Sequence, residues 1–231
     1  MDIRQRDISG AGDISGILEH GVIEVWRADT ALQRDFILSR LSLLDSNEKE
    51  RYVSFRREED RLCFAGGRIF TKILAGRYLS KETEEINVIS EKYMKPFIEC
   101  GGKLKYNISH SGGYILLAFT YGSEVGVDIE KKDDSFDVMS LINVLHPVER
   151  TAVLENGNVD TFYTIWTAKE AYVKAIGKGF SISPNSFYIN KEGFAVRGCL
   201  ISKDHKVVRI DAGSSFFGAL CFGINNYGIH I

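Results

Sequence analysis

The sequence predicts an α+β fold, in which helices are grouped between strands that pair as hairpins. Three observations carry this prediction. Two long segments, Arg57–Leu79 and Phe162–Phe180, repeat apolar residues at helical spacing. The segment Val125–Glu130 alternates with the period of a strand. Several short strand-like segments at hairpin spacing close the chain.

The composition is that of an ordinary globular protein and excludes several functional classes. The chain has 231 residues, 44% of them hydrophobic, and a formal net charge of −2, which suits one large or two small domains. Because no dense block of lysine and arginine occurs, we expect no nucleic-acid partner. The longest apolar run, Phe216–Ile224, is too short to span a bilayer, so we expect no membrane association.

The cysteines and the first residues indicate a cytoplasmic protein. The segment M-D-I-R-Q-R-D lacks the apolar core of a secretory signal. None of the four cysteines has C-x-x-C spacing, which is typical of reduced thiols rather than of a disulfide framework or zinc site: Cys63, Cys100, Cys199 and Cys221.

The first half begins with residues 1–20, which are polar and show no period; we interpret them as a loosely held lead-in. A strand is predicted at Gly21–Ala28 and a helix at Thr30–Leu43. The next helix begins near Asp45, since Glu48 follows three residues later as in a capping box.

The helix Arg57–Leu79 is the longest of this half, and the glycines at 66 and 67 inside it predict close packing or the approach of a ligand. Four short strands are expected after it: Ile86–Ser90, Pro96–Ile98, Leu104–Ser109 and Tyr114–Thr120. The segment Thr120–Glu124 is the expected boundary, dividing the chain into halves 1–120 and 121–231.

The second half opens with the strand Val125–Glu130, in which valine and isoleucine make one face and Asp128 and Glu130 lie side by side on the other. Two helices follow, the second beginning at Pro147, a residue suited to the first turn. The expected elements after this strand are helices Asp137–Leu145 and Pro147–Asn156, the Phe162 helix, and strands Ser186–Asn190, Phe194–Arg197, Lys206–Asp211, Phe216–Ile224 and Tyr227–Ile231.

The helix that begins at Phe162 carries Trp166, Glu170 and Lys174 at i, i+4 and i+8, which places them on one stripe with Lys169 beside it. Gly177 lies where a glycine would end the helix. Taken alone, the Glu170–Lys174 pair fits an exposed amphipathic face, and the acidic strand fits a half-buried strand that shows carboxylates to water.

Together, the strand and the helix indicate a Mg²⁺ site. The carboxylates of Asp128, Glu130 and Glu170 form an oxygen-only set, and Mg²⁺ prefers a few carboxylates, water and substrate phosphate oxygens. Lys169 and Lys174 beside them are suited to phosphate oxygens.

The motifs G-V-D-I-E (126–130) and W-T-A-K-E-A-Y-V-K-A-I-G-K-G (166–179) resemble the paired signature of the 4′-phosphopantetheinyl transferases. The segment Tyr106–Ser111 contains N-x-S-H-S, which is similar to the Sfp-type branch of that family. D-R-x-x-F-x-x-G-R (60–68) is similar to a family helix whose basic residues reach the 3′-phosphate of coenzyme A. Y-M-K-P (93–96) matches a family turn in part, with Met94 in place of glycine.

The resemblance implies two similar α+β halves in pseudo-twofold arrangement, with the active site in the cleft between them, and a monomer. It implies transfer of the 4′-phosphopantetheine arm from coenzyme A to a serine of an apo acyl, peptidyl or polyketide carrier protein, with Mg²⁺ or Mn²⁺ and release of 3′,5′-ADP. Carrier recognition is expected near Phe136–Leu145.

The resemblance also implies roles for single residues. Asp128, Glu130 and Glu170 would hold the metal, and Glu170, Lys174 and His110 would be catalytic. Glu170 would take the serine proton either directly or through a metal-bound water. The residues that would bind coenzyme A are Arg61, Arg68, Lys95, Ser109, His110, Lys169 and Lys174.

Two other functions remain open at this point. A Mg²⁺-dependent hydrolase of coenzyme A or a nucleotide diphosphate would use the same charged residues with water as nucleophile. A non-catalytic module that binds carrier proteins would need no complete acidic trio.

Overall fold

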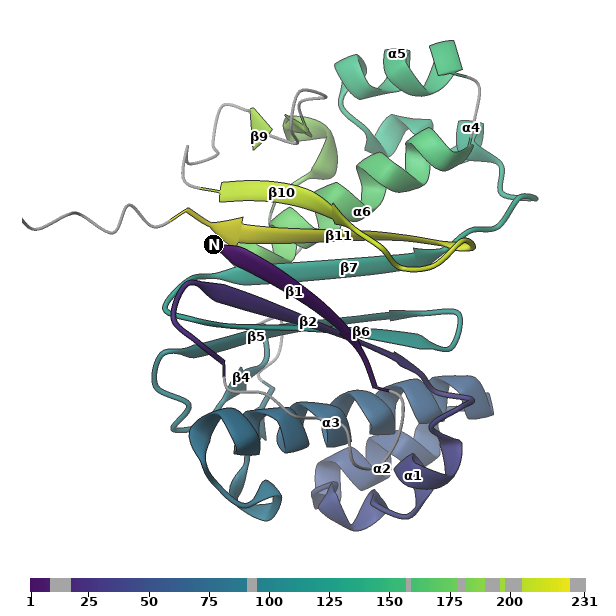
Figure 1. Ribbon diagram of the computed structural model, residues 1–231. Helices are drawn as coiled ribbons and strands as arrows, with labels where there is room; N and C mark the ends of the chain where they lie inside the picture. The colour runs from purple at the N-terminus through teal and green to yellow at the C-terminus, as the bar shows by residue number, and fades with distance from the viewer. Residues whose placement is uncertain are drawn as a thin grey trace, which may run out of the picture. The chain divides into compact units, whose positions relative to one another are not determined.

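A computed structural model describes residues 1–8, 18–90, 95–156, 159–177, 182–189, 196–197 and 205–224. The chain divides into two compact units, Met1–Gly122 (unit 1) and Ser123–Ile231 (unit 2). Each unit contains a β-sheet and helices (Figure 1), so the predicted α+β class is confirmed.

Unit 1 contains a four-stranded sheet in the order β1-β2-β6-β5. Its strands are β1 (Asp2–Asp7), β2 (Val22–Asp29), β5 (Leu104–Ser111) and β6 (Tyr114–Tyr121). β1 pairs with β2 in parallel, and the other neighbours are antiparallel. Two short strands, β3 (Val88–Ile89) and β4 (Phe97–Ile98), pair with each other.

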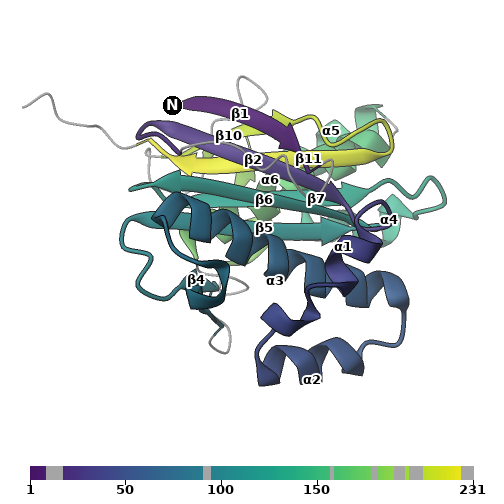
Figure 2. The same ribbon diagram turned by 60° about the horizontal axis from the view of Figure 1, so that its bottom comes forward.

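The helices of unit 1 are α1 (Arg34–Leu38), α2 (Ser46–Ser54), α3 (Glu58–Leu79) and the 3-10 turns η1 (Leu41–Leu43) and η2 (Thr83–Glu85). Of these, α3 packs on β5 and β6, while α1 and α2 pack against α3. Figure 2 shows α3 running along one face of the sheet, where Trp26, Phe70 and Phe119 are buried in one core. At Gly67 an added Cβ would lie 2.6 Å from Cδ1 of Ile108, so the glycine is explained by close packing.

Several sequence predictions for unit 1 are confirmed and two are wrong. The capping box of Asp45 and Glu48 is present. The helix expected over Thr30–Leu43 is shorter, because the Asp29 carboxylate accepts from the amides of residues 31 and 32 and makes a turn first. The interpretation of residues 1–20 as a lead-in missed β1, which has no apolar face and is held by pairing with β2 and by the Arg27–Asp7 ion pair at 2.8 Å.

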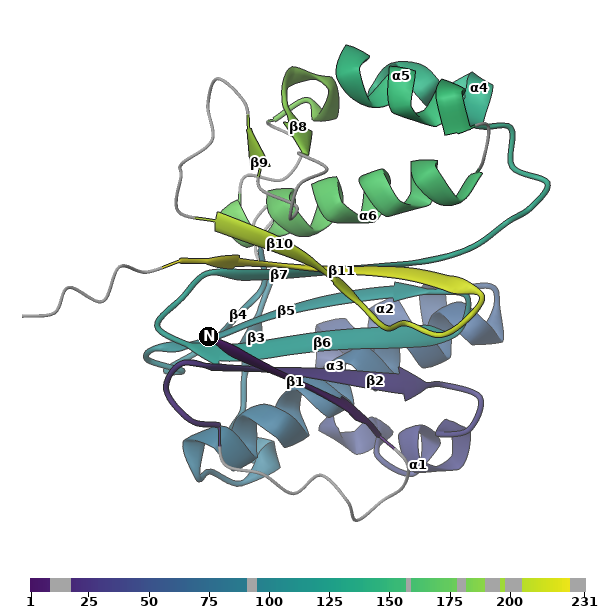
Figure 3. The ribbon, with the colours of Figure 1, turned by 45° about the horizontal axis from the view of Figure 1, so that its top comes forward.

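Unit 2 contains a three-stranded antiparallel sheet in the order β10-β11-β7, formed by β7 (Val125–Lys131), β10 (His205–Ile210) and β11 (Phe216–Gly223). The helix α6 (Val159–Ile176) lies along this sheet in Figure 3 and shares a core with it. The other elements are α4 (Val138–Leu141), η3 (Ile142–Val144), α5 (Pro147–Asn156), η5 (Pro184–Ser186), β8 (Tyr188–Ile189) and β9 (Val196–Arg197).

The end of α6 agrees with the sequence. Gly177 adopts a left-handed φ of 68°, as expected of the residue that ends a helix. The predicted strand Tyr227–Ile231 and the residues Lys178–Phe180 lie outside the described part of the chain.

Candidate functional site

The contact between β7 and α6 is unusually close at Gly126. A Cβ added there would lie 2.0 Å from the carbonyl oxygen of Ala171 and 2.4 Å from the amide nitrogen of Ala175. Only glycine lets the helix backbone lie directly on the strand. Because alternate residues of a strand share a face, Asp128 and Glu130 follow Gly126 on the side that α6 covers.

Asp128 and Lys174 form an ion pair at this contact. The Lys174 ammonium donates to Oδ1 of Asp128 at 2.6 Å. The Asp128 side chain is 5% exposed and that of Lys174 is 28% exposed, so the pair lies at the margin of the core. The structure therefore brings together a predicted metal ligand and a predicted phosphate ligand.

Glu170 belongs to the same cluster. It is half-buried, and its pKa is raised above the ordinary value, chiefly by burial, then by the negative charge of Asp128, with Lys174 acting in the opposite direction. Two carboxylates thus repel each other beside one ammonium. Such a cluster carries excess negative charge and favours a cation.

Glu130 is located further along β7, toward Tyr163. The pKa of Tyr163 is raised, chiefly by burial and also by the negative charges of Asp133 and Glu130. Within the residues that the structure describes, no group of three or more histidine, cysteine, aspartate or glutamate side chains could hold a metal ion. The Asp128–Glu170 pair still fits Mg²⁺, because this ion is commonly held by one or two carboxylates with water and phosphate oxygens as its other ligands.

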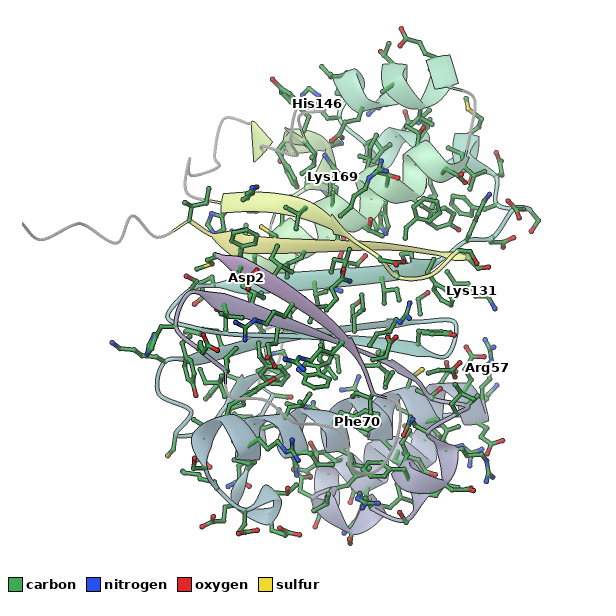
Figure 4. All side chains as sticks on the ribbon, viewed as in Figure 1. Asp2, Arg57, Phe70, Lys131, His146 and Lys169 are labelled. Atoms are coloured by element: carbon green, nitrogen blue, oxygen red, sulfur yellow. The ribbon has the colours of Figure 1, made fainter. Side chains whose placement is uncertain are left out.

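Lys169 does not belong to this cluster, and its assignment to a phosphate of coenzyme A stays a prediction that its buried position does not support. Its side chain is fully buried, and the ammonium donates to Oε2 of Glu149 at 2.6 Å and to the carbonyl oxygen of Phe187 at 2.6 Å. Figure 4 labels Lys169 on α6 and His146 at the start of α5. The enclosing groups leave this ammonium inaccessible to a ligand phosphate.

Sequence reasoning did not single out Glu149. Its position three residues after His146, at the start of a helix, gave one signal, since its carboxylate accepts from the His146 amide at 3.1 Å as in a capping box. Its buried partner Lys169 lies twenty residues away along the chain, and no local pattern connects the two.

Unit 1 holds the other predicted ligands of coenzyme A. His110 is exposed near the end of β5, while the neighbouring Ser109 is buried. Lys95, just before β4, is half-buried. Arg61, in the first turns of α3, is also half-buried and donates to the carbonyl oxygen of Arg56 at 3.3 Å.

Arg68 is engaged within unit 1. Its guanidinium donates to Oγ of Ser90 at 2.7 Å and lies 3.3 Å from the buried carboxylate of Glu48. The Arg68 side chain is 15% exposed, and the same carboxylate pairs with Lys72 at 3.3 Å. The predicted role of Arg68 in binding coenzyme A stays a prediction, and a ligand phosphate would share the guanidinium with Glu48 and Ser90.

Comparison with known proteins places this chain in a class of transferases. Residues 124–213 match the model of the 4′-phosphopantetheinyl transferase superfamily, and residues 28–121 match that of the N-terminal domain of 4′-phosphopantetheinyl transferases. The chain belongs to the 4′-phosphopantetheinyl transferase family. Both the strand β7 and the helix α6 lie inside the first match.

The relatives identify the Sfp type within that family. The chain is 31% identical over 159 residues to the 4′-phosphopantetheinyl transferase gsp of Aneurinibacillus migulanus, covering 67% of this chain and 65% of the relative. It is 31% identical over 192 residues to a phosphopantetheinyl transferase of Thraustochytrium sp., covering 74% and 67%. It is 27% identical over 151 residues to Sfp of Bacillus subtilis, covering 64% and 67%. The matches therefore span about two thirds of each relative.

Every helix in the described residues is too short or too polar to cross a bilayer.

Proposed function

We propose that this protein transfers the 4′-phosphopantetheine arm of coenzyme A to a serine of an apo carrier protein. The observation that carries the proposal is the cluster of Asp128, Glu170 and Lys174 at the β7–α6 contact, inside the segment that matches the superfamily. The halves 1–120 and 121–231 are proposed as its two domains. The relatives from Aneurinibacillus migulanus and Bacillus subtilis are named as transferases of this group.

The metal proposed for this site is Mg²⁺, with Mn²⁺ as a substitute. Asp128 and Glu170 would hold it. Glu130, the third carboxylate that the sequence predicts, lies further along β7 and is not grouped with these two in the described part of the chain. When bound, the ion supplies neutralisation and orientation of diphosphate oxygens. The excess negative charge of the cluster is the reason for assigning it a cation.

The reaction is displacement at the β-phosphorus of coenzyme A. The serine oxygen forms a bond to that phosphorus, the bond to the bridging oxygen breaks, and 3′,5′-ADP leaves with the electron pair. Glu170 takes the serine proton; its raised pKa brings it closer to the value that a general base needs at neutral pH. Lys174 turns from Asp128 to the phosphates, where it neutralises the charge of the leaving group.

The ligands of coenzyme A in unit 1 are proposed to be His110, Ser109, Lys95, Arg61 and Arg68. The exposed imidazole of His110 is suited to a diphosphate oxygen, and Arg61 to the 3′-phosphate. Carrier recognition is assigned to Phe136–Leu145. The exposed side chains of Met139 and Leu141 in that segment offer apolar contacts to a carrier. We further propose that the protein is cytoplasmic and that it is a monomer. Size-exclusion chromatography with light scattering will test the oligomeric state.

Intact-protein mass spectrometry tests the function. An apo carrier protein incubated with this protein, coenzyme A and Mg²⁺ should gain the mass of one phosphopantetheine arm, and EDTA should prevent the gain. Asp128→Ala should reduce the rate at least about a hundredfold, equivalent to about 2.7 kcal/mol of transition-state stabilisation, with the fold intact.

The other outcomes decide against the proposal. Breakdown of coenzyme A without modification of any carrier would identify a hydrolase. Carrier binding with neither reaction would identify a binding module. A rate for Asp128→Ala close to that of the unmodified protein under saturating Mg²⁺ would remove Asp128 from the site.

A further inference from the structure

Unit 2 buries a second charged pair that the proposed reaction does not use. Lys169 has no exposed surface, and the side chain of Glu149 is 3% exposed. Their charged atoms are 2.6 Å apart. This pair is separate from the Asp128–Lys174 pair, although Lys169 is the residue directly before Glu170.

The carboxylate of Glu149 joins three segments of unit 2. Its Oε2 accepts from Lys169 on α6 and from the amide of His146 at the start of α5. Its Oε1 accepts from the amide of Ile189 in β8 at 2.8 Å. Lys169 completes the connection, because its ammonium donates to the carbonyl oxygen of Phe187 and lies 4.2 Å from the centre of that ring.

Stability alone does not explain this pair. Burial lowers the pKa of Lys169, and Glu149 acts against this effect. A buried ion pair usually adds little stability over apolar residues of similar volume, because removing two charges from water is costly. What such a pair provides is a defined orientation of the elements that carry it, since each hydrogen bond fixes both an angle and a distance.

The orientation that the pair fixes is the rotation of α6 about its own axis. Successive residues of a helix are about 100° apart, so holding Lys169 determines where Glu170 points. A rotation of about 20° moves an atom about 5–6 Å from the helix axis by roughly 2 Å. Displacements of about 1 Å in an active site can cost about a hundredfold in rate.

We propose that Glu149 and Lys169 are positioning residues: they set the rotation of α6 and so place Glu170 and Lys174 correctly for the transfer reaction. This inference rests on the proposed transfer reaction. It predicts that the pair affects the turnover number and leaves the affinity for coenzyme A unchanged. A lysine that bound a phosphate directly would instead affect the affinity for coenzyme A and leave the turnover number unchanged.

The test is a double-mutant cycle of Glu149→Gln, Lys169→Met and the double variant, with kcat and KM for coenzyme A measured on an apo carrier. Each single variant should lower kcat at least tenfold, with KM within about twofold of the starting value. The double variant should be no slower than the slower single variant, because the two residues act as one unit. Lys132→Met removes a lysine from an exposed pair with Asp134 and Asp160 and should change neither constant.

The double variant leaves no uncompensated buried charge and should fold even where a single variant does not. If it folds and turns over at the starting rate, the pair has no positioning role. If Lys169→Met raises KM for coenzyme A while Glu149→Gln does not, Lys169 binds substrate and the proposal is overturned.

A measurement on the free protein separates this inference from the proposed function. The amide resonances of Glu170 and Lys174 should shift in Glu149→Gln, a change remote from both in the chain. Shifted resonances in a protein that modifies no carrier would preserve the positioning role and reject the transfer reaction. Unshifted resonances in an active enzyme would reject the positioning role alone.

Discussion

Replacing Lys174 with methionine should increase the affinity of the metal-free protein for Mn²⁺. In the structure, the Lys174 ammonium is bound to Asp128 at 2.6 Å and occupies a carboxylate that the metal needs. A divalent cation must displace it. Methionine keeps most of the side-chain volume and removes the competing charge.

The size of the effect follows from the ion pair that is lost. A hydrogen bond to a charged group contributes about 1.5–3 kcal/mol, and each 1.4 kcal/mol is a factor of about ten in affinity. Because the Asp128 side chain is only 5% exposed, water replaces the ammonium poorly. The affinity for Mn²⁺ should therefore rise about ten- to a hundredfold.

Electron paramagnetic resonance of free Mn²⁺, in the absence of coenzyme A, measures this affinity directly. Lys206→Met removes the same charge from an exposed position on β10 and serves as the control. Thermal unfolding gives a second reading: Lys174→Met should unfold at a lower temperature in EDTA and gain more from added Mn²⁺ than the unmodified protein does. An unchanged or weaker Mn²⁺ affinity, or an equal gain in Lys206→Met, would refute the reasoning.

Three further substitutions probe the core and the site. Gly126→Ala should destabilise unit 2 by about 3 kcal/mol in urea unfolding, because its Cβ meets helix backbone rather than a movable side chain; a loss under 1 kcal/mol would mean that α6 can move. The raised pKa of Glu170 means that its carboxyl stabilises the fold at low pH and loses this contribution as the pH rises through that pKa. Glu170→Gln should therefore raise the unfolding free energy at neutral pH while abolishing transfer. In the unmodified protein, the transfer rate should fall as the pH drops through the raised pKa. A Gln variant less stable than the unmodified protein at neutral pH would contradict the expected sign of the change in unfolding free energy. Tyr78→Phe removes the hydroxyl that donates to buried Glu24 at 2.5 Å and accepts from the indole of Trp26 at 2.8 Å. The unfolding free energy of unit 1 should therefore fall by about 1–3 kcal/mol. An unchanged urea midpoint would show that other groups satisfy both partners.

The sequence predicted the elements that have a clear period. The β7 alternation and the α6 stripe place Asp128 and Glu170 correctly on a strand and a helix, and the structure brings them together. The face of β7 that carries the carboxylates is covered by α6 rather than open to water, and Gly126 was the available signal, since a glycine within a strand can mark the close approach of another backbone.

The environment of Lys169 could have been inferred in part. It lies four residues after Ile165 and three before Tyr172, which is the spacing of the apolar face of a helix. A lysine at such a position is either buried with a partner or extends to the surface, and the sequence did not name the partner. Glu149 supplies it through a contact that depends on how α5 packs on α6, which no local pattern encodes.

Gly126 and Lys169 constrain α6 in complementary ways. The contact at Gly126 fixes how closely the helix lies on β7 at Ala171 and Ala175, which are one and five residues after Glu170. The Glu149–Lys169 pair fixes the rotation at the residue before Glu170. A helix held by only one of these contacts could turn over the strand or lift from it, and either motion would separate Glu170 from Asp128. The reactive carboxylate is therefore placed by packing and by a buried pair on both sides of it in the chain, so substitutions at either constraint should impair the site without touching a substrate.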